Sequence, residues 1–213
     1  MTDPADLRRG YRRGHLDERD VAATWLEQLQ NWFGAAAADP NVLEPNAIQL
    51  ATVDADGCPA VRTVLAKAID NRGVVFYTNH DSAKGRALRA NPRAAIVFAW
   101  LAQERQVRLA GAITQVERIE TERYFATRPR ESQIGAWASP QSEVVSSRAE
   151  LDAAEAATAT RFEGQQIPAP PYWGGYLLRP HAVEFWQGRR GRLHDRIRFR
   201  QDGDVWIRER LAP

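Results

Sequence analysis

The sequence predicts an α+β protein built on an antiparallel β-barrel or strongly curled sheet with peripheral helices. Roughly six to eight short stretches have the alternating or wholly apolar pattern of β-strands. Turn signals such as Asp54–Gly57 and Asp202–Gly203 join neighbouring stretches, as in an antiparallel meander. Segments with helical spacing lie between the strands, which is typical of the α+β class.

The first 19 residues are polar and rich in arginine, and this pattern predicts a flexible basic arm. A single domain is expected from residue 20 to residue 213, because no repeat or linker divides this stretch. Between Asp20 and about Ala38, apolar residues recur at helical spacing until Asp39 and Pro40 end the helix. Strands are then expected at 47–53, 60–67 and 74–78.

The second half of the chain continues the alternation of helices and strands. A helix is predicted from about Ser82 to Ala90, followed by strands at 94–101 and 106–116. The first of these strands is almost wholly apolar, so we expect it to be buried on both faces. Helices at 118–127, 131–138 and 147–162 and a proline-rich loop precede the closing strands, which are expected near 174–186, 193–200 and 204–210.

Composition excludes several classes of protein. The 29 basic and 27 acidic residues nearly balance, which argues against a broad nucleic-acid-binding face. No stretch approaches the roughly 20 apolar residues of a membrane span, and the one cysteine, Cys58, cannot form an internal disulfide. We therefore expect a cytoplasmic protein. The four histidines are scattered, so no metal site is expected.

The sequence also lacks the common catalytic and nucleotide-binding motifs. It contains no Gly-x-Ser-x-Gly elbow, no Gly-x-Gly-x-x-Gly fingerprint after a strand and no Gly-Lys-Ser/Thr phosphate loop. Any phosphate must then be held by side chains. Without a protein nucleophile or a metal, we expect that a borrowed cofactor supplies the difficult chemistry.

Two groups of polar residues lie on the predicted strands at 60–67 and 74–78 and at the helix start that follows them. Arg62 and Lys67 are five apart on one predicted strand, so we expect them on opposite faces unless a bulge intervenes. Lys67 has apolar neighbours, where an unpaired ammonium is costly, and this favours a ligand role over a solvated surface. Tyr77 and Thr78 precede a helix start at Ser82–Lys84, which gathers hydroxyls, N–H groups and an ammonium where an anion is favoured.

A second candidate phosphate site contains Tyr124, Arg128 and Ser132. These residues bring a phenol, a guanidinium and a hydroxyl together at spacings of four, a set that suits one phosphate dianion. The alternative is an ordinary helix end. Gln106 and the pair Gln141–Ser142 offer uncharged donors and acceptors for the edge of a heterocycle, although surface glutamines are commoner.

The segment from Glu184 to Arg196 combines an aromatic ring with several cations. Trp186 can stack on a planar ligand. Arg192, His194 and Arg196 alternate, so they face one way if the segment is a strand, and their mutual repulsion favours an anionic or electron-rich ligand. The alternative is a basic hairpin edge that discourages pairing with other strands.

Together these residues form motifs that resemble the pyridoxine (pyridoxamine) 5′-phosphate oxidase family. The resemblance runs in order over essentially the whole chain. It is carried by Arg62–Lys67, Val75–Asn79, Glu104–Val107, Tyr124–Trp137, Pro171–Gly175, Glu184–Gly188, Arg192–Arg196 and Arg210–Pro213.

The resemblance implies a split β-barrel homodimer that binds FMN at the subunit interface. One departure from the family is visible: Ala83 stands where the family usually has an arginine, so one contact to the FMN phosphate is expected to be missing. The residues that it assigns to FMN are Arg62, Val64, Leu65, Lys67, Tyr77, Thr78, Lys84, Gln106, Gln141, Ser142, Trp186 and Arg196.

The resemblance also assigns the substrate site. It implies that Lys67, Tyr124, Arg128 and Ser132 hold the substrate phosphate. Arg192 and His194 would lie over the pyridine ring as the catalytic pair, and the arm would cover the substrate through Arg8 and Tyr11.

The activity that the resemblance implies is the oxidation of pyridoxamine and pyridoxine 5′-phosphate to pyridoxal 5′-phosphate. A hydride would pass from C4′ to the flavin, O2 would be the acceptor and H2O2 the second product. A neutral His194 is expected to accept a hydrogen bond from the C4′ substituent. The alternatives are a related flavin oxidase acting on another aromatic substrate, such as a phenazine-pathway enzyme, and a non-catalytic flavin or pyridoxal-phosphate carrier. A nucleic-acid-binding protein is a third alternative, less favoured by the sequence.

Overall fold

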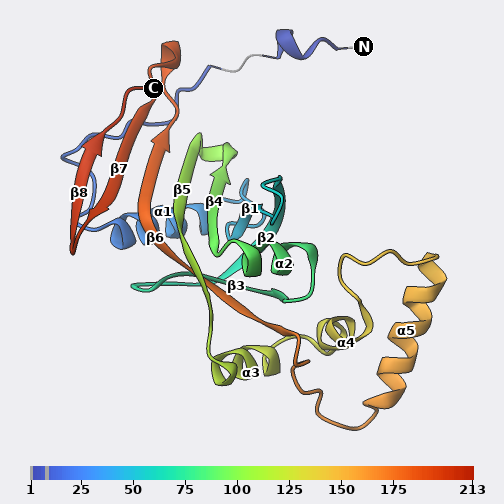
Figure 1. Ribbon diagram of the computed structural model, residues 1–213. Helices are drawn as coiled ribbons and strands as arrows, with labels where there is room; N and C mark the ends of the chain where they lie inside the picture. The colour runs from blue at the N-terminus through green and yellow to red at the C-terminus, as the bar shows by residue number, and fades with distance from the viewer. Residues whose placement is uncertain (1, 8–9) are drawn as a thin grey trace.

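The computed structural model describes residues 2–7 and 10–213, so Arg8, which the resemblance assigns to the substrate, lies outside the described residues. Its centre is a closed barrel of six antiparallel strands in the order β3-β2-β1-β4-β5-β6, closed by pairing of β3 with β6 (Figure 1). The barrel strands are β1 (Ala47–Val53), β2 (Pro59–Asp70), β3 (Gly73–Asn79), β4 (Arg93–Trp100), β5 (Arg105–Gln115) and β6 (Trp173–Gln187). The expected α+β fold with a barrel is therefore confirmed.

Two further strands extend the sheet beyond the barrel. β7 (Asp195–Asp202) pairs with the second half of β6, and β8 (Val205–Arg210) pairs with β7. The closing strand expected at 193–200 therefore starts two residues later. A 3-10 turn, η3 (Arg190–Arg192), separates β6 from β7, so Arg192 and His194 precede the strand that was expected to contain them.

The structure contains five α-helices in its described part. They are α1 (Trp25–Ala37), α2 (Ala83–Ala90), α3 (Arg118–Ala126), α4 (Arg130–Ala138) and α5 (Arg148–Arg161). Four agree with the sequence prediction to within about two residues. The expected start of α1 at Asp20 is wrong, because Thr24 is in an extended conformation and its side chain accepts a hydrogen bond from the Glu27 N–H, which caps the helix there.

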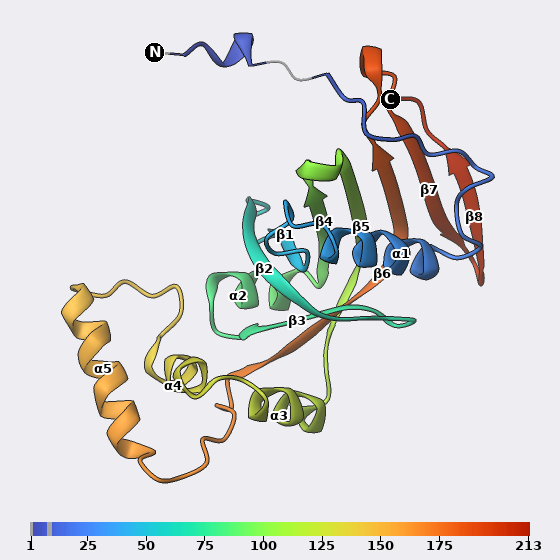
Figure 2. The same cartoon turned by 180° about the vertical axis from the view of Figure 1, so that it is seen from behind.

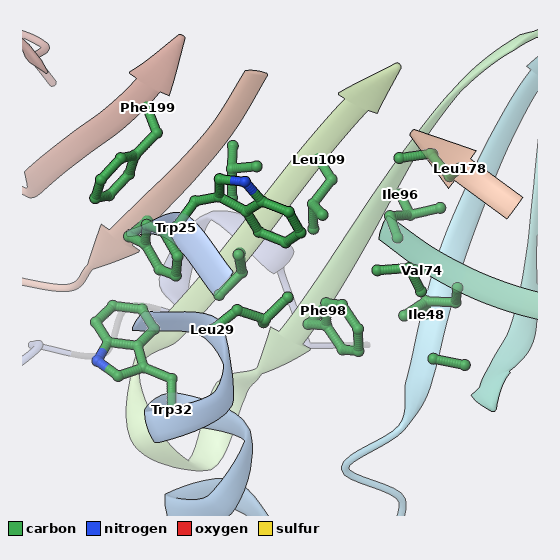
Figure 3. Close-up of a cluster of buried hydrophobic side chains, with 14 of the residues drawn as sticks. Trp25, Leu29, Trp32, Ile48, Val74, Ile96, Phe98, Leu109, Leu178 and Phe199 are labelled. Carbon is green, nitrogen blue, oxygen red and sulfur yellow. The ribbon is translucent and has the colours of Figure 1, made fainter. Parts of the chain in front are cut away.

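The main core fills the barrel and the space under α1. Figure 3 shows Leu29 and Trp32 projecting from α1 toward apolar side chains of the strands, and both are buried. Trp32 meets Phe185 of β6 edge-on, with 5.4 Å between ring centroids. A smaller core lies beyond the barrel and links α3, α4 and the start of β6 through Phe125, Ile134 and Trp173.

The strand buried on both faces is β3 rather than β4. Val74, Val75 and Phe76 are fully buried, so both faces of β3 are covered where it closes the barrel on β6. On β4 only alternate residues such as Ile96 and Phe98 are buried, so the expectation of two buried faces is wrong. The outward-facing residues Ala95, Val97 and Ala99 are partly exposed and apolar.

The two ends of the molecule differ (Figures 1 and 2). Helices α3, α4 and α5 lie near the start of β6, whereas residues 11–18 of the arm and the C-terminus lie near the end of β6. Residues 11–18 of the arm contact the barrel, and Leu16 is only 3% exposed. Flexibility of the arm in solution stays a prediction. No helix in the described residues is long and apolar enough to cross a membrane.

The backbones of β5 and β6 approach closely at Gly111, and a substitution there tests the fold. A Cβ added at Gly111 would lie 1.9 Å from the carbonyl oxygen of Arg179, at the register shift between these strands. Gly111→Ala is expected to lower the free energy of unfolding by about 2 kcal/mol or more. The matched control is Gly34→Ala on α1, where a Cβ meets nothing within 4 Å.

Both variants are compared with the wild type by urea denaturation. Gly34→Ala is expected to raise the free energy of unfolding by about 0.5–1 kcal/mol, because alanine has the higher helix propensity. Equal stability of the Gly111→Ala variant and the wild type would contradict the packing described for β5 and β6.

Candidate functional site

A cavity of about 580 Å³ opens between β2, β3, α3, α4 and the start of β6. It brings together residues that are up to 110 positions apart in the chain, from Thr63 to Trp173. Ten of its fourteen lining residues were predicted as site residues, namely Val64, Leu65, Lys67, Tyr77, Thr78, Lys84, Tyr124, Arg128, Ser132 and Gln141.

The ammonium group of Lys84 lies at the base of this cavity. Lys84 is 9% exposed, and its Nζ donates to three neutral oxygens: Thr78 Oγ1 at 3.1 Å, Ser82 Oγ at 3.1 Å and Gln141 Oε1 at 3.0 Å. Burial, with a smaller contribution from the nearby charge of Arg62, lowers the pKa of Lys84 to about 8. A buried cation whose partners are all neutral favours an anionic ligand.

Arg62 is half-buried and is not among the residues that line the cavity. Its Nη1 donates to the Leu50 carbonyl and, at 2.7 Å, to Thr52 Oγ1. These bonds fix the side chain across β1. The charge of Arg62 disfavours the protonated form of Lys84, so an anion bound at Lys84 would relieve the repulsion between the two cations.

Arg128 supplies a second cation to the lining of this cavity. Its guanidinium carbon lies 4.6 Å from the Trp173 ring centroid and 5.4 Å from that of Phe125. Its Nη1 is buried and has no hydrogen-bond partner among the described residues. Burial lowers the pKa of Arg128. An unpaired buried guanidinium N–H is costly, so it indicates a missing acceptor such as a phosphate oxygen.

Three stacked aromatic rings, of which Trp173 contacts Arg128, lie in the lining of the cavity. Tyr77 stacks on Tyr124 at 4.1 Å and on Trp173 at 5.5 Å between centroids. Burial raises the pKa of Tyr77 to about 12, so its phenol remains protonated at neutral pH. The prediction missed Trp173 as a site residue, although it lies in the quoted Pro171–Gly175 motif. It also missed the lining residues Thr63, Thr127 and Pro129.

Lys67 reaches the cavity because β2 is irregular at this point. The register between β2 and β3 shifts between Ala66 and Ala68, which places Lys67 in a bulge. Its side chain is exposed at the rim, so the expectation that apolar neighbours desolvate it is wrong. The bulge also breaks the simple alternation that would have put Arg62 and Lys67 on opposite faces.

The loop after α4 carries Gln141 and Ser142. Gln141 Oε1 accepts hydrogen bonds from Thr78 and Lys84, which ties the loop to the cavity. Ser142 is exposed next to it, outside the lining residues, and has a φ of 76°. A left-handed backbone at a residue other than glycine costs on the order of 1 kcal/mol and often marks a functional loop.

The remaining predicted residues form a second group at the far end of β6. Gln106 of β5, Trp186 of β6 and Arg196 of β7 are direct neighbours across three strands, so their side chains lie on one face. Arg196 Nε donates to Glu184 Oε1 at 2.7 Å and its Nη1 donates to the Ala212 carbonyl. Glu184 is 7% exposed, so this pair fixes Arg196 firmly.

His194 lies beside Trp186, with 4.6 Å between ring centroids, and Tyr11 of the arm meets both rings edge-on. Burial, with the nearby charge of Arg192, lowers the pKa of His194, which favours the neutral ring at pH 7. His194 Nδ1 accepts a hydrogen bond from the Arg189 N–H, so the neutral ring carries its proton on Nε2.

The alternation expected for Arg192, His194 and Arg196 is therefore wrong. Gly191 and Arg192 both have left-handed backbones, with φ of 67° and 63°, and these reverse the chain before β7 begins. Arg192 is exposed in this turn rather than on the strand. Only Arg196 of the three lies within β7.

The two groups lie at opposite ends of one strand. Trp173 begins β6 and lines the cavity, whereas Trp186 is 13 residues further along the same strand. Figure 1 shows the length of β6. At about 3.3 Å per residue, a straight strand of that length spans roughly 40 Å. One copy of the chain therefore presents two separate halves of the predicted site.

Comparisons with known proteins show the family to which the chain is similar. Residues 35–161 match the pyridoxamine 5′-phosphate oxidase family, and residues 173–213 match the pyridoxine 5′-phosphate oxidase C-terminal dimerisation region. A pyridoxine/pyridoxamine 5′-phosphate oxidase of Saccharopolyspora erythraea is 52% identical over 97% of this chain and 94% of its own length. One from Thermosynechococcus vestitus is 51% identical over the full length of both chains.

Solved structures show the same fold. PhzG from Burkholderia lata, in complex with tetrahydrophenazine-1-carboxylic acid, has a TM-score of 0.87 and 32% identity, and the match covers 93% of this chain and 98% of PhzG. A pyridoxamine 5′-phosphate oxidase-related, FMN-binding protein of Nostoc punctiforme has a TM-score of 0.71 at 19% identity, covering 90% and 98% of the two chains. The expected split-barrel fold is thereby confirmed.

The lowered pKa of Lys84 predicts how anion binding depends on pH. Lys84 is cationic below pH 8 and loses its charge as the pH rises through about 8. The affinity for sulfate, which does not titrate in this range, is expected to fall about tenfold between pH 7 and pH 9.5. Titration calorimetry on the flavin-free protein measures this. Lys84→Met should remove the pH dependence, and a wild-type affinity that stays constant over this range would contradict the role of Lys84.

Proposed function

The chain belongs to the pyridoxamine 5′-phosphate oxidase family, and we propose that it is an FMN-dependent oxidase of pyridoxamine and pyridoxine 5′-phosphate. The products would be pyridoxal 5′-phosphate and H2O2, with O2 as the acceptor. The observation that carries the proposal is a pair of cations that line one cavity: the buried Lys84, and Arg128 with a buried Nη1 that has no partner among the described residues. Two phosphates, one from the cofactor and one from the substrate, would satisfy them.

The residues around Lys84 fit the phosphate of FMN. Lys84, Arg62 and the Thr78 hydroxyl would hold its oxygens, and the loop at Gln141 and Ser142 would close over it. Ala83, at the start of α2, carries no charge where the family usually has an arginine. Arg62 and Lys84 would therefore be the only cations of this group that bind the phosphate. When bound, FMN supplies a ring that accepts two electrons from the substrate and passes them to O2.

The residues around Arg128 fit the phosphate of the substrate. The unpaired Nη1 of Arg128 would donate to one phosphate oxygen, and Tyr124, Ser132 and Lys67 would donate to the others. A clamp of this kind fixes the substrate's position and orientation, which is a large part of the catalytic effect in reactions between bound partners.

The second group would be supplied by another copy of the chain. The match of residues 173–213 to a dimerisation region supports a homodimer, as does the partly exposed apolar face of β4. In such a dimer, Trp186, Gln106 and Arg196 of one subunit would contact the flavin held by the other. Arg192 and His194 would lie over the substrate ring.

The tautomer of His194 changes its expected role. Because Nδ1 accepts from the Arg189 N–H, the neutral ring would donate from Nε2 to the C4′ substituent rather than accept from it. Arg192 would orient the polar substituents of the pyridine ring. Both residues act by positioning the carbon that is oxidised.

A related oxidase activity on another aromatic substrate is the second candidate, because PhzG has a similar structure. The relatives that are about half identical over the whole chain carry the pyridoxine/pyridoxamine 5′-phosphate oxidase name. The cationic cavity also favours a phosphorylated substrate. Parallel assays with pyridoxamine 5′-phosphate and a reduced phenazine carboxylic acid distinguish the two candidates.

The proposal predicts a yellow protein whose flavin absorbance is bleached by pyridoxamine 5′-phosphate without O2. Arg192→Ala and His194→Ala are expected to lower kcat/KM about a hundredfold, because each removes a group that orients the substrate. Flavin content should stay close to that of the wild type. Stopped-flow bleaching and peroxide release measure these effects, and wild-type turnover in both variants would refute the assignment.

A further inference from the structure

The arm from Tyr11 to Glu18 is bound to the end of the barrel by the side chains of Glu104 and Asp195, which are not among the predicted site residues. Arg12 and Arg13 donate their backbone N–H groups to the same oxygen, Glu104 Oε2, at 2.7 and 2.8 Å. A carboxylate that accepts from two consecutive N–H groups recognises the backbone of the arm rather than its side chains.

A second carboxylate holds the arm four residues later. Leu16 N–H donates to Asp195 Oδ2 at 3.0 Å, and the Leu16 carbonyl accepts from Arg210 Nη2 at 3.0 Å. Arg210 Nη1 also donates to Asp195 Oδ1 at 2.9 Å, and Arg210 pairs with Glu18. Asp195 and Arg210 thus bind both backbone groups of Leu16, whose side chain is buried.

Glu104 is itself fixed next to the second group of site residues. Its backbone is left-handed, with φ of 56°, and its carbonyl accepts from the Gly188 N–H and from Gln187 Nε2. Gly188 and Gln187 directly follow Trp186. Any movement of the Glu104 turn is therefore coupled to the end of β6.

The position of Tyr11 depends on these anchors. Its ring lies 5.6 Å from Trp186 and 5.5 Å from His194, edge-on to both. The ring fits against the backbone at Gly188, where an added Cβ would lie 2.7 Å from Tyr11 Cγ. The Tyr11 ring thereby forms a wall beside His194.

We infer that Glu104 and Asp195 are positioning residues that hold the arm closed, so that Tyr11 packs against Trp186 and His194. This rests on the proposed function, because the wall matters for catalysis only if a substrate binds beside His194. The two carboxylates contact the arm backbone and act on the substrate only through Tyr11.

The test compares the holoprotein with Glu104→Ala and Glu104→Gln variants, and with Glu155→Ala on exposed α5 as the matched control. Trypsin cleavage after Arg12 and Arg13, followed by mass spectrometry, reports directly on the docked arm. Glu104→Ala is expected to increase the cleavage rate about tenfold and to raise the KM for pyridoxamine 5′-phosphate, with flavin content unchanged. Glu104→Gln should be intermediate, and Asp195→Asn should behave like Glu104→Ala.

A second variant separates the wall from the anchors. Gly188→Ala should displace the Tyr11 ring and raise KM, while the bonds from Arg12 and Arg13 to Glu104 keep cleavage slow. Wild-type cleavage in Glu104→Ala, or faster cleavage with an unchanged KM, would overturn the inference. If the wild type does not oxidise pyridoxamine 5′-phosphate, the proposed function fails, and the cleavage rates still show whether Glu104 and Asp195 hold the arm.

Discussion

The pairing of β6 with three strands determines where both groups of site residues lie. Its first residues pair with β3, most of its length pairs with β5, and its last residues pair with β7. The β3 contact aligns Thr78 with Gly174 and Tyr77 with Gly175, which brings the Tyr77 ring onto Trp173 and closes the barrel. The β5 and β7 contacts align Gln106, Trp186 and Arg196 at the other end.

The electrostatics of the two ends are different. In the cavity, Lys84 has neutral partners and Arg128 has an unpaired nitrogen, so this end favours anions. At the other end, Glu184 pairs with both Arg108 and Arg196, and Asp195 pairs with Arg210. These paired charges fix side chains and the arm in place. A dimer that joins the two ends would place a phosphate-binding pocket beside a preorganised aromatic wall.

Local sequence patterns predicted most of the elements and the cavity residues. Tyr124, Arg128 and Ser132 could be grouped because they lie close together in the sequence, on either side of one turn. Ser82 was recognised as the start of the helix that carries Lys84. The family resemblance supplied the remaining assignments. The closure of β3 on β6 could not be read from the chain, because it joins segments about 100 residues apart.

The predictions that were wrong assumed a regular alternation of side chains along each strand, and local irregularities of the backbone break that alternation. One extra residue in β2 interrupts the alternation at Lys67, and two left-handed residues at Gly191 and Arg192 delay the expected strand, which starts at Asp195. The contacts of the arm with Glu104 and Asp195 join residues at least 91 positions apart, so no pattern in the polar arm could indicate them.

The central claim is that each site is completed by a second copy of the chain, and subunit complementation tests it most directly. Arg128→Ala impairs the cavity and His194→Ala impairs the other group, so each homodimer should be nearly inactive. If the two variants are unfolded, mixed and refolded together, half of the dimers carry both changes and each of those has one intact site. The account predicts recovery of about a quarter of the wild-type activity. A mixture no more active than its separate components would contradict it.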